Sequence, residues 1–113
     1  MNAEIAKLSA AADEASEFLK SMASPVRLRL LCAVAGREAS VGELAALLGV
    51  RQSVASQHLA LLRKDGLVRS RREGQTMWYG LADDRVIRIV DVLQATFCPA
   101  PDEAARPRKG GAA

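Results

Sequence analysis

Two short amphipathic segments joined by a glycine-containing turn constrain the fold of this chain more than any other feature. The first, SVGELAALLG, opens with Ser40 three residues before Glu43, which is the spacing of a helix capping box. Gly49 is expected to end this helix, and a second helix, RQSVASQHLALLRKDG, is predicted to begin near Arg51. Two short helices joined in this way form a helix-turn-helix motif.

The pattern changes after Gly66. The segment LVRSRREGQTMWYGL is rich in β-branched, aromatic and basic residues, which predicts a β-hairpin with its tip near Gly74. A basic hairpin that directly follows a helix-turn-helix is a wing. On its return strand we expect Trp78 and Tyr79 to anchor the hairpin to the core rather than to stack on bases.

A further helix is predicted before the helix-turn-helix. Ser24 and Pro25 favour an N-cap and a first helical position, and Gly36 is a candidate for the C-terminal cap. One apolar face of this helix is predicted to consist of Leu28, Leu31, Cys32 and Ala35.

Amphipathic helices are also predicted at both ends of the module. Residues 4–22 carry apolar side chains at spacings of three and four, and a last helix is expected to begin at Asp83 or Asp84 and to stop before Pro99. A small core does not cover both apolar stripes, so we expect these two helices to pair with a second copy of the chain. The stripe of the last helix is Val86, Ile89 or Val90, Leu93 and Phe97.

The predicted fold is therefore a mainly α winged helix-turn-helix of order α-α-α-α-β-β-α, dimeric through its first and last helices. Residues 1–98 are expected to form this single domain. Residues 99–113 are rich in Pro, Gly and Ala without periodicity and are expected to be disordered.

Several classes of protein are disfavoured. No apolar run approaches the ~18 residues of a membrane span, and the N-terminus has no signal-peptide core, so we expect a cytoplasmic protein. Two cysteines in a reducing cytosol do not predict a permanent disulfide, and they are too few for a four-thiolate zinc site. Without an activated cysteine motif, a Gly-rich phosphate loop or a suitable carboxylate pair, the chain is not expected to be an enzyme or to carry a cofactor.

Positive charge gathers in the helix-turn-helix and wing. Residues 51–80 hold six basic and two acidic residues, whereas residues 1–50 hold five basic and six acidic residues. This asymmetry indicates a face for a polyanion such as DNA, although a solvated charged surface would show the same count. Arg69, Arg71 and Arg72 lie beside the predicted tip, where arginines follow phosphates or enter a minor groove.

The second helix of the motif has two faces suited to DNA recognition. Ala55, Leu59 and Leu62 form an inward stripe. His58 lies at the border of the faces, where we expect packing or a phosphate contact rather than a metal. The side chains predicted to meet base edges or phosphates are Gln52, Ser53, Ser56 and Gln57.

These motifs resemble the ArsR/SmtB family of small dimeric winged-helix repressors over about residues 15–98. VASQHLALLRKDGLV is similar to the family's recognition helix, SPVRLRLL to its second helix and RREGQTMWYGL to its wing. The resemblance implies a homodimer, operator DNA as partner, and release of DNA when an inducer binds.

The sequence departs from the family in two ways. Its recognition helix begins Arg51, Gln52, Ser53 where the family usually has Ser-Gln-Pro. The metal-binding Cys-Val-Cys pair is replaced by residues 40–42, and the last helix has Asp91 but no histidine. No metal site is therefore expected.

Cys32 and Cys98 are 66 positions apart. LLCAVAGREASVGEL and ATFC resemble the persulfide-responsive BigR/SqrR subgroup, which implies that the pair senses reactive sulfur species. A di- or polysulfide bridge between the two helices would then release the repressor from its operator. Two alternatives stay open: a general sensor of peroxide or disulfide stress, and a pair of small buried side chains without a sensing role. Because a helix C-terminus disfavours a thiolate, Cys32 is the expected attacking thiol and Cys98 the resolving one, although a nearby arginine would reverse this order, so both assignments stay open.

Overall fold

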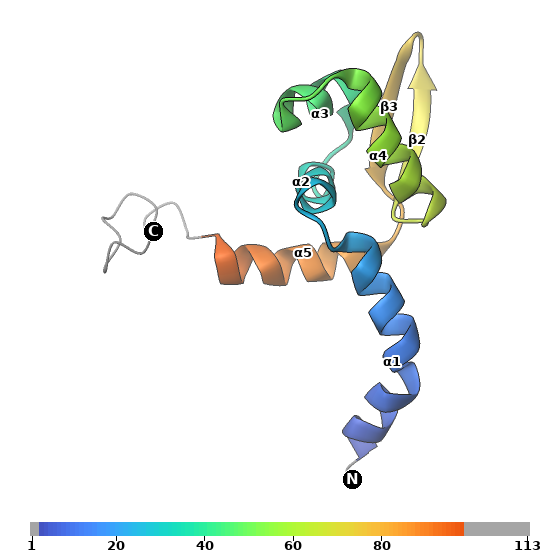
Figure 1. Cartoon of the computed structure of the whole chain (residues 1–113), viewed down its shortest axis with the longest axis vertical. Coiled ribbons are helices and arrows are strands. Elements are labelled where there is room, and N and C mark those ends of the chain that lie inside the picture. Colours follow the sequence, from blue (N-terminus) through green and yellow to red (C-terminus); the bar gives the residue numbers. More distant parts are fainter. Residues whose placement is uncertain (1–2, 99–113) are drawn as a thin grey trace, which may run out of the picture.

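The computed structural model describes residues 3–98, and it has the predicted winged-helix architecture (Figure 1). The predicted tail, residues 99–113, lies outside the described residues. One short strand, β1, was not predicted. The elements in chain order are α1 (Ala3–Met22), α2 (Pro25–Ala33), β1 (Ala39–Ser40), α3 (Val41–Leu48), α4 (Gln52–Lys64), β2 (Val68–Glu73), β3 (Thr76–Leu81) and α5 (Asp84–Phe97).

Local hydrogen bonds explain where the helices begin. The Ser24 hydroxyl accepts the Arg27 N–H at 3.0 Å, with Pro25 in the first helical position. Ser40 and Glu43 form the predicted capping box: the Glu43 N–H donates to the Ser40 hydroxyl at 3.1 Å, and the Ser40 N–H donates to the Glu43 carboxylate at 2.9 Å. Both predicted caps are confirmed, and of the two candidates for α5, Asp83 is its N-cap.

The turn of the helix-turn-helix has the predicted glycine. Gly49 ends α3 in the left-handed region with a φ of 69°, and its N–H donates to the carbonyls of residues 45 and 46. At the start of α4, Arg51 occupies the N-cap position but its side chain makes no capping hydrogen bond within the described part of the chain. The recognition helix thus begins without the side-chain cap that serine would supply.

The wing belongs to a three-stranded antiparallel sheet of order β1-β3-β2. Glu73 pairs with Thr76 across the tip, where Gly74 has a φ of 63°, so the predicted hairpin is confirmed. Strand β1 has two residues, with Ala39 opposite Tyr79 on β3. A two-residue strand is too short to show an alternating pattern, which is why the sequence did not reveal it.

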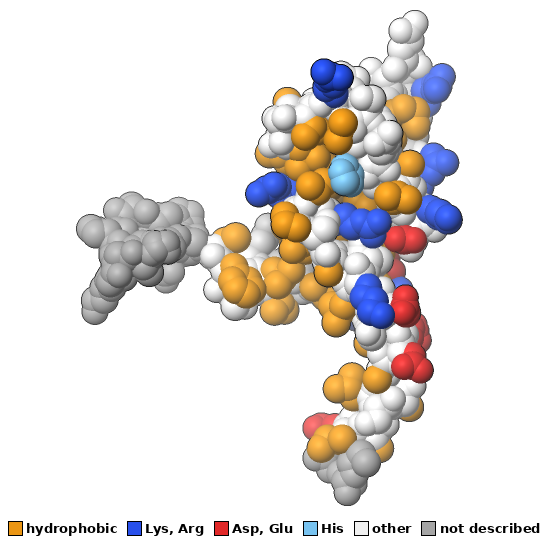
Figure 2. Space-filling view, viewed as in Figure 1, with side chains coloured by type: hydrophobic (Ala, Val, Ile, Leu, Met, Phe, Trp, Pro, Cys, Tyr) orange, Lys and Arg blue, Asp and Glu red, His pale blue; other side chains and the backbone are white. Residues whose placement is uncertain are grey.

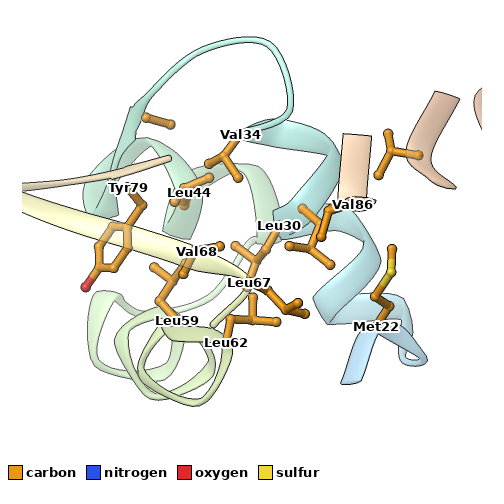
Figure 3. Close-up of a cluster of buried hydrophobic side chains, with 13 residues drawn as sticks. Met22, Leu30, Val34, Leu44, Leu59, Leu62, Leu67, Val68, Tyr79 and Val86 are labelled. Carbon is orange, nitrogen blue, oxygen red and sulfur yellow. The ribbon is translucent and has the colours of Figure 1, made fainter. Parts of the chain in front are cut away.

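The core lies between α2, α3, α4, α5 and the base of the sheet, with Met22 from the end of α1 at its edge (Figure 3). The predicted inward stripe of α4 is confirmed, since Ala55, Leu59 and Leu62 are fully buried. Tyr79 is also buried as predicted, whereas Trp78 is only half-buried. The other large, fully buried side chains are Leu30, Leu31, Leu44, Leu67, Val68, Val86 and Val90.

Two details predicted for α2 are wrong. The helix ends at Ala33 rather than near Gly36, because the chain must turn to bring the next residues beside β3; the Val34 N–H closes the helix on the Leu30 carbonyl at 3.2 Å. Its buried face is also shifted from the predicted one, because α2 contacts α3 and α4 as well as α1 and α5. The buried residues are Leu30, Leu31 and Val34, while Leu28, Cys32 and Ala35 are half-buried.

The first and last helices keep much of their apolar surface exposed. Helix α1 extends away from the rest of the molecule and α5 lies across the base of α2 (Figure 1). Leu8 on α1 is 65% exposed and Phe97 on α5 is 75% exposed. Arg85 joins the two helices, because its guanidinium lies over the Phe18 ring at 4.4 Å and pairs with Glu14 at 3.4 Å. Within residues 3–98, no helix is long and apolar enough to cross a membrane.

Candidate nucleic-acid interface and thiol pair

The outer face of α4 carries the polar side chains that the sequence predicted. Gln52, Ser53, Ser56 and Gln57 are all exposed, and His58 is half-buried at the edge of this face. Burial of the opposite stripe fixes the rotation of the helix, so these side chains point away from the core. The short side chains lie in the first half of the helix, the half that meets base edges in helix-turn-helix proteins.

Two apolar side chains on α4 were missed by the sequence analysis. Val54 is 36% exposed and Leu61 is 48% exposed. They are seven residues apart and therefore lie on one side of the helix. A helical wheel would have shown this, because neither residue falls on the inward stripe. A methyl-bearing side chain beside Ser53 and Gln57 can contact a thymine methyl group.

The side chain of Gln52 lies close to α3. Its side-chain amide nitrogen would lie 3.3 Å from a Cβ placed on Gly42. The absence of a side chain at Gly42 therefore leaves room for Gln52 between the two helices of the motif. Gln52 borders the predicted DNA-reading face rather than occupying its centre.

The three wing arginines divide between the two faces of β2. Side chains alternate along a strand, so Arg69 and Arg71 share one face while Ser70 and Arg72 share the other. On the second face, the Arg63 guanidinium of α4 donates to the Ser70 hydroxyl at 2.9 Å, which ties the wing to the recognition helix. Arg72 is exposed on this face and has no ion pair with any residue in 3–98.

Arg71 is engaged within the protein. Its guanidinium pairs with Glu38 at 2.8 Å and with Glu73 at 3.6 Å, and it lies over the Trp78 ring at 5.7 Å. These carboxylates raise the pKa of Arg71 further above its ordinary value, so its charge persists at any physiological pH. Of the three wing arginines, Arg72 is the one without an ion pair within residues 3–98, and for all three a DNA contact stays a prediction.

Charge is unevenly distributed over the surface. Figure 2 shows Lys and Arg side chains spread over the region of α4 and the wing, whereas Asp and Glu side chains gather over α1 and its junction with the rest of the molecule. At that junction Arg27 of α2 donates to the Ser21 carbonyl at 2.7 Å and pairs with Asp65 at 3.3 Å. Asp65 is the C-cap of α4, so this pair links the end of the recognition helix to α2.

The two cysteines lie on the two predicted helices. Cys32 is half-buried in α2, and Cys98 is exposed at the C-cap of α5, where its N–H donates to the Gln94 carbonyl at 2.9 Å. Both thiols are free within the described residues. Burial raises the pKa of the Cys32 thiol, and the charge of Cys98 raises it further. The two helices that carry these residues, α2 and α5, contact each other.

Burial disfavours a thiolate at Cys32, and which of the two cysteines attacks stays a prediction. A raised pKa keeps Cys32 protonated at neutral pH, while Cys98 is the more exposed of the two thiols. An apolar surface groove lined by Leu28, Arg29, Cys32, Ala33 and Leu47 still leads to the Cys32 side chain. A small molecule can thus reach either sulfur.

Within residues 3–98, no three His, Cys, Asp or Glu side chains lie close enough together to hold a metal ion. His58, on α4, and Asp91, on α5, therefore do not belong to a cluster of that size.

Comparison with known proteins gives consistent matches along most of the chain. Residues 24–70 match the family model described as "Bacterial regulatory protein, arsR family". The biofilm growth-associated repressor of Agrobacterium fabrum is 47% identical over 92 residues, which cover 81% of this chain and 78% of that protein. The transcriptional activator HlyU of Vibrio cholerae is 46% identical over 83 residues, 74% of this chain and 77% of that protein.

Solved structures resemble the fold as closely. Reduced HlyU from Vibrio cholerae superposes with a TM-score of 0.77 at 41% identity, over 82% of this chain and 98% of that one. The transcriptional repressor BigR from Xylella fastidiosa superposes with a TM-score of 0.78 at 35% identity, over 88% of this chain and all of that one. The proteins that this chain resembles are thus transcription regulators and not enzymes.

Proposed function

This chain belongs to the ArsR family of bacterial regulatory proteins, and on that premise we propose that it is a homodimeric repressor whose affinity for operator DNA is controlled by Cys32 and Cys98. The observation that carries the proposal is that helices α2 and α5 contact each other, and that each of them has one free cysteine at or near its C-terminal end. The two cysteines are 66 positions apart in sequence, so their placement on two helices that contact each other supports a joint role.

The DNA contacts follow from the exposed face of α4 and from the wing. Ser53, Ser56 and Gln57 meet base edges in the major groove, with Gln52 and His58 at the borders of that face. From the wing, Arg72 contacts the phosphate backbone of the adjacent groove. As a DNA-bound regulator, the protein acts in the cytoplasm.

The second copy of the chain covers the exposed stripes of α1 and α5. A groove between these helices is lined mainly by apolar surface and includes Ala15, Phe18, Leu19 and Ile89. Exposed apolar side chains continue toward both ends, at Leu8 on α1 and at Phe97 on α5. Exposed apolar surface of this extent marks an interface, and a two-fold dimer buries the same residues on both copies.

The proposed chemistry consumes a persulfide as a two-electron oxidant. One cysteine thiolate attacks the terminal sulfur of R–S–SH, forms Cys–S–SH and releases RS⁻. The second thiolate then attacks the inner sulfur of Cys–S–SH, forms a disulfide and releases HS⁻. If both cysteines carry the extra sulfur, condensation gives a trisulfide bridge and H₂S. A direct disulfide needs the two Cα atoms within about 7 Å, and added sulfur atoms relax that limit.

A bridge between α2 and α5 would affect DNA binding through the dimer. Helix α5 contributes to the proposed interface, and the spacing of the two recognition helices depends on the geometry of that interface. Small shifts at a subunit interface are amplified in this way because packed interfaces have discrete arrangements. The Arg27–Asp65 pair offers a second connection, from α2 to the end of α4.

The test is a gel-shift titration with the operator. An organic persulfide is expected to release the parent protein from DNA, whereas Cys32→Ser and Cys98→Ser should stay bound. Release of either variant as readily as the parent would refute the paired mechanism. Mass spectrometry of the treated protein separates a response to persulfide from a response to peroxide or disulfide stress. Each extra sulfur in the bridge between Cys32 and Cys98 adds the mass of one sulfur atom to that of the disulfide form.

A second candidate function is activation of transcription, since the similar HlyU is named an activator. A reporter gene downstream of the operator separates the two. Deletion of the protein raises expression if it represses and lowers expression if it activates. An enzyme role would require turnover of persulfide by catalytic amounts of protein, and a protein-binding role would be excluded by strongly salt-dependent binding to duplex DNA.

A further inference from the structure

We infer that Glu38 is a positioning residue that sets how many wing arginines reach the DNA backbone. It holds Arg69 and Arg71 within the protein, so the wing offers Arg72 to the duplex. This inference rests on the proposed DNA-binding function and adds a regulator of its affinity that lies outside the recognition helix.

The contacts of Glu38 are short and use both oxygens of its carboxylate. The Arg69 guanidinium pairs with Oε2 at 2.8 Å. The Arg71 guanidinium approaches Oε1 with one terminal nitrogen at 2.8 Å and with Nε at 2.9 Å. The Glu38 side chain is 26% exposed and is the least exposed of the three. One partly covered carboxylate therefore binds two arginines.

The sheet provides the path for this contact. Glu38 precedes β1, the arginines lie on β2, and β3 runs between them. Arg69 is paired in register with Gly80, and a Cβ on Gly80 would lie 3.1 Å from the Arg69 guanidinium. Arg71 is paired with Trp78 and lies over its ring. A glycine and a flat aromatic ring on the central strand thus let both arginines cross it.

Strand alternation explains why Arg72 is not held in the same way. Arg72 lies on the opposite face of β2, together with Ser70. That face is the one joined to the recognition helix, through the hydrogen bond from Arg63 to Ser70. The wing therefore separates its cations, with two turned to Glu38 and one on the side of the recognition helix.

Glu38 competes with phosphate for the same guanidinium groups. Hydrogen bonds from Arg71 and Arg69 lower the pKa of the Glu38 carboxyl, so it is fully charged at neutral pH. An arginine that contacts a DNA phosphate releases about 0.9 of a counterion, which steepens the dependence of log affinity on log salt by that amount. Release of two arginines should change this slope by about 2 per copy.

The experiment compares the full-length parent with Glu38→Gln. Affinity for a labelled duplex of mixed sequence, about 30 base pairs long, is measured by fluorescence anisotropy over a range of salt concentrations. We expect Glu38→Gln to bind more tightly at low salt, with a slope steeper by about 1 to 2 per bound copy. The control is Glu17→Gln, which removes the same charge from an exposed ion pair on α1 and should leave the slope unchanged apart from a small general effect.

Variants of the arginines make the test decisive. Arg69→Gln combined with Arg71→Gln should keep nearly the parental slope, and adding Glu38→Gln to that pair should give no further increase. An unchanged slope or weaker binding in Glu38→Gln overturns the inference. A decrease of about 2 in the slope of log affinity against log salt for the double variant of Arg69 and Arg71 also overturns it. Thermal melts verify folding; if Glu38→Gln does not fold, the arginine variant decides. A parent that does not bind the duplex contradicts the proposed function itself.

Discussion

Bridging Cys32 to Cys98 should stabilise the folded chain, and the expected magnitude follows from the position of the two residues. They are 66 positions apart in sequence, so a bridge closes a long loop in the unfolded state. The loop-closure relation then gives about 4 kcal/mol of stabilisation as an upper limit. For a domain of this size each kcal/mol changes the melting temperature by about 4 to 8 °C, so the limit corresponds to about 15 to 30 °C.

The measured value should be smaller than this limit by the strain that the bridge imposes. A disulfide tolerates a narrow range of Cα separations, whereas a tri- or tetrasulfide spans more. We therefore expect the polysulfide form to be more stable than the disulfide form of the same protein. The difference between the loop-closure limit and the measured stabilisation estimates the free energy available to distort α2 and α5. A difference of about 3 kcal/mol would account for a hundredfold loss of DNA affinity.

The assay is thermal unfolding followed by circular dichroism, at one protein concentration, before and after treatment with an organic persulfide. Intact mass under non-reducing, denaturing conditions assigns the number of bridging sulfurs and shows whether the bridge is within one chain. Cys98→Ser treated in the same way is the control and should not change its melting temperature. An intrachain bridge that leaves the melting temperature unchanged or lowered would refute the argument that the two thiols are neighbours in the native fold.

Three further outcomes follow from the structure. Iodoacetamide should modify Cys98 before Cys32, because Cys98 is the more exposed thiol. The rate of modification at Cys32 should keep increasing as the pH rises well above neutral, because the raised pKa of Cys32 keeps its thiol protonated at neutral pH. Peptide mass spectrometry across a pH series measures both rates, and equal rates would contradict the burial of Cys32. Leu59→Ala should cost about 2 to 5 kcal/mol of stability in a denaturant melt, since the side chain is fully buried, and a cost below about 1 kcal/mol would contradict its place in the core. Gln57→Ala should weaken operator binding by about 1 to 3 kcal/mol per half-site with little change in salt dependence. Arg72→Ala should instead reduce the slope of log affinity against log salt by about 1 per copy on any duplex. The reverse pattern in anisotropy titrations would exchange the roles assigned to Gln57 and Arg72.

Local signals in the sequence were enough to locate most of the fold. The capping box at Ser40, the glycines at 49 and 74 and the inward stripe of α4 each depend on residues within one or two turns of one another. All of them have the predicted role in the structure. The exposed polar face of α4 follows from the same local pattern, because the buried stripe defines its opposite side.

Features that depend on distant pairs could not be predicted in this way. Strand β1 exists through its pairing with β3, some 40 residues later in the chain. The role of Glu38 depends on the register of three strands and on Gly80, neither of which leaves a periodic pattern. The end of α2 at Ala33 was also missed, because it reflects where the following strand must go rather than the cap chemistry of Gly36.

Helix α1 buries one residue fully, Met22, against its own chain. Most of its twenty residues therefore have few contacts that hold them in a helix when the chain is alone. An unpaired copy presents a long, loosely held segment that proteases cut readily. If the proposed dimer forms, assembly would also affect the lifetime of the protein in the cell, because unpaired copies would be cleared while paired copies would persist. The amount of regulator would in this way be limited by its own dimerisation constant.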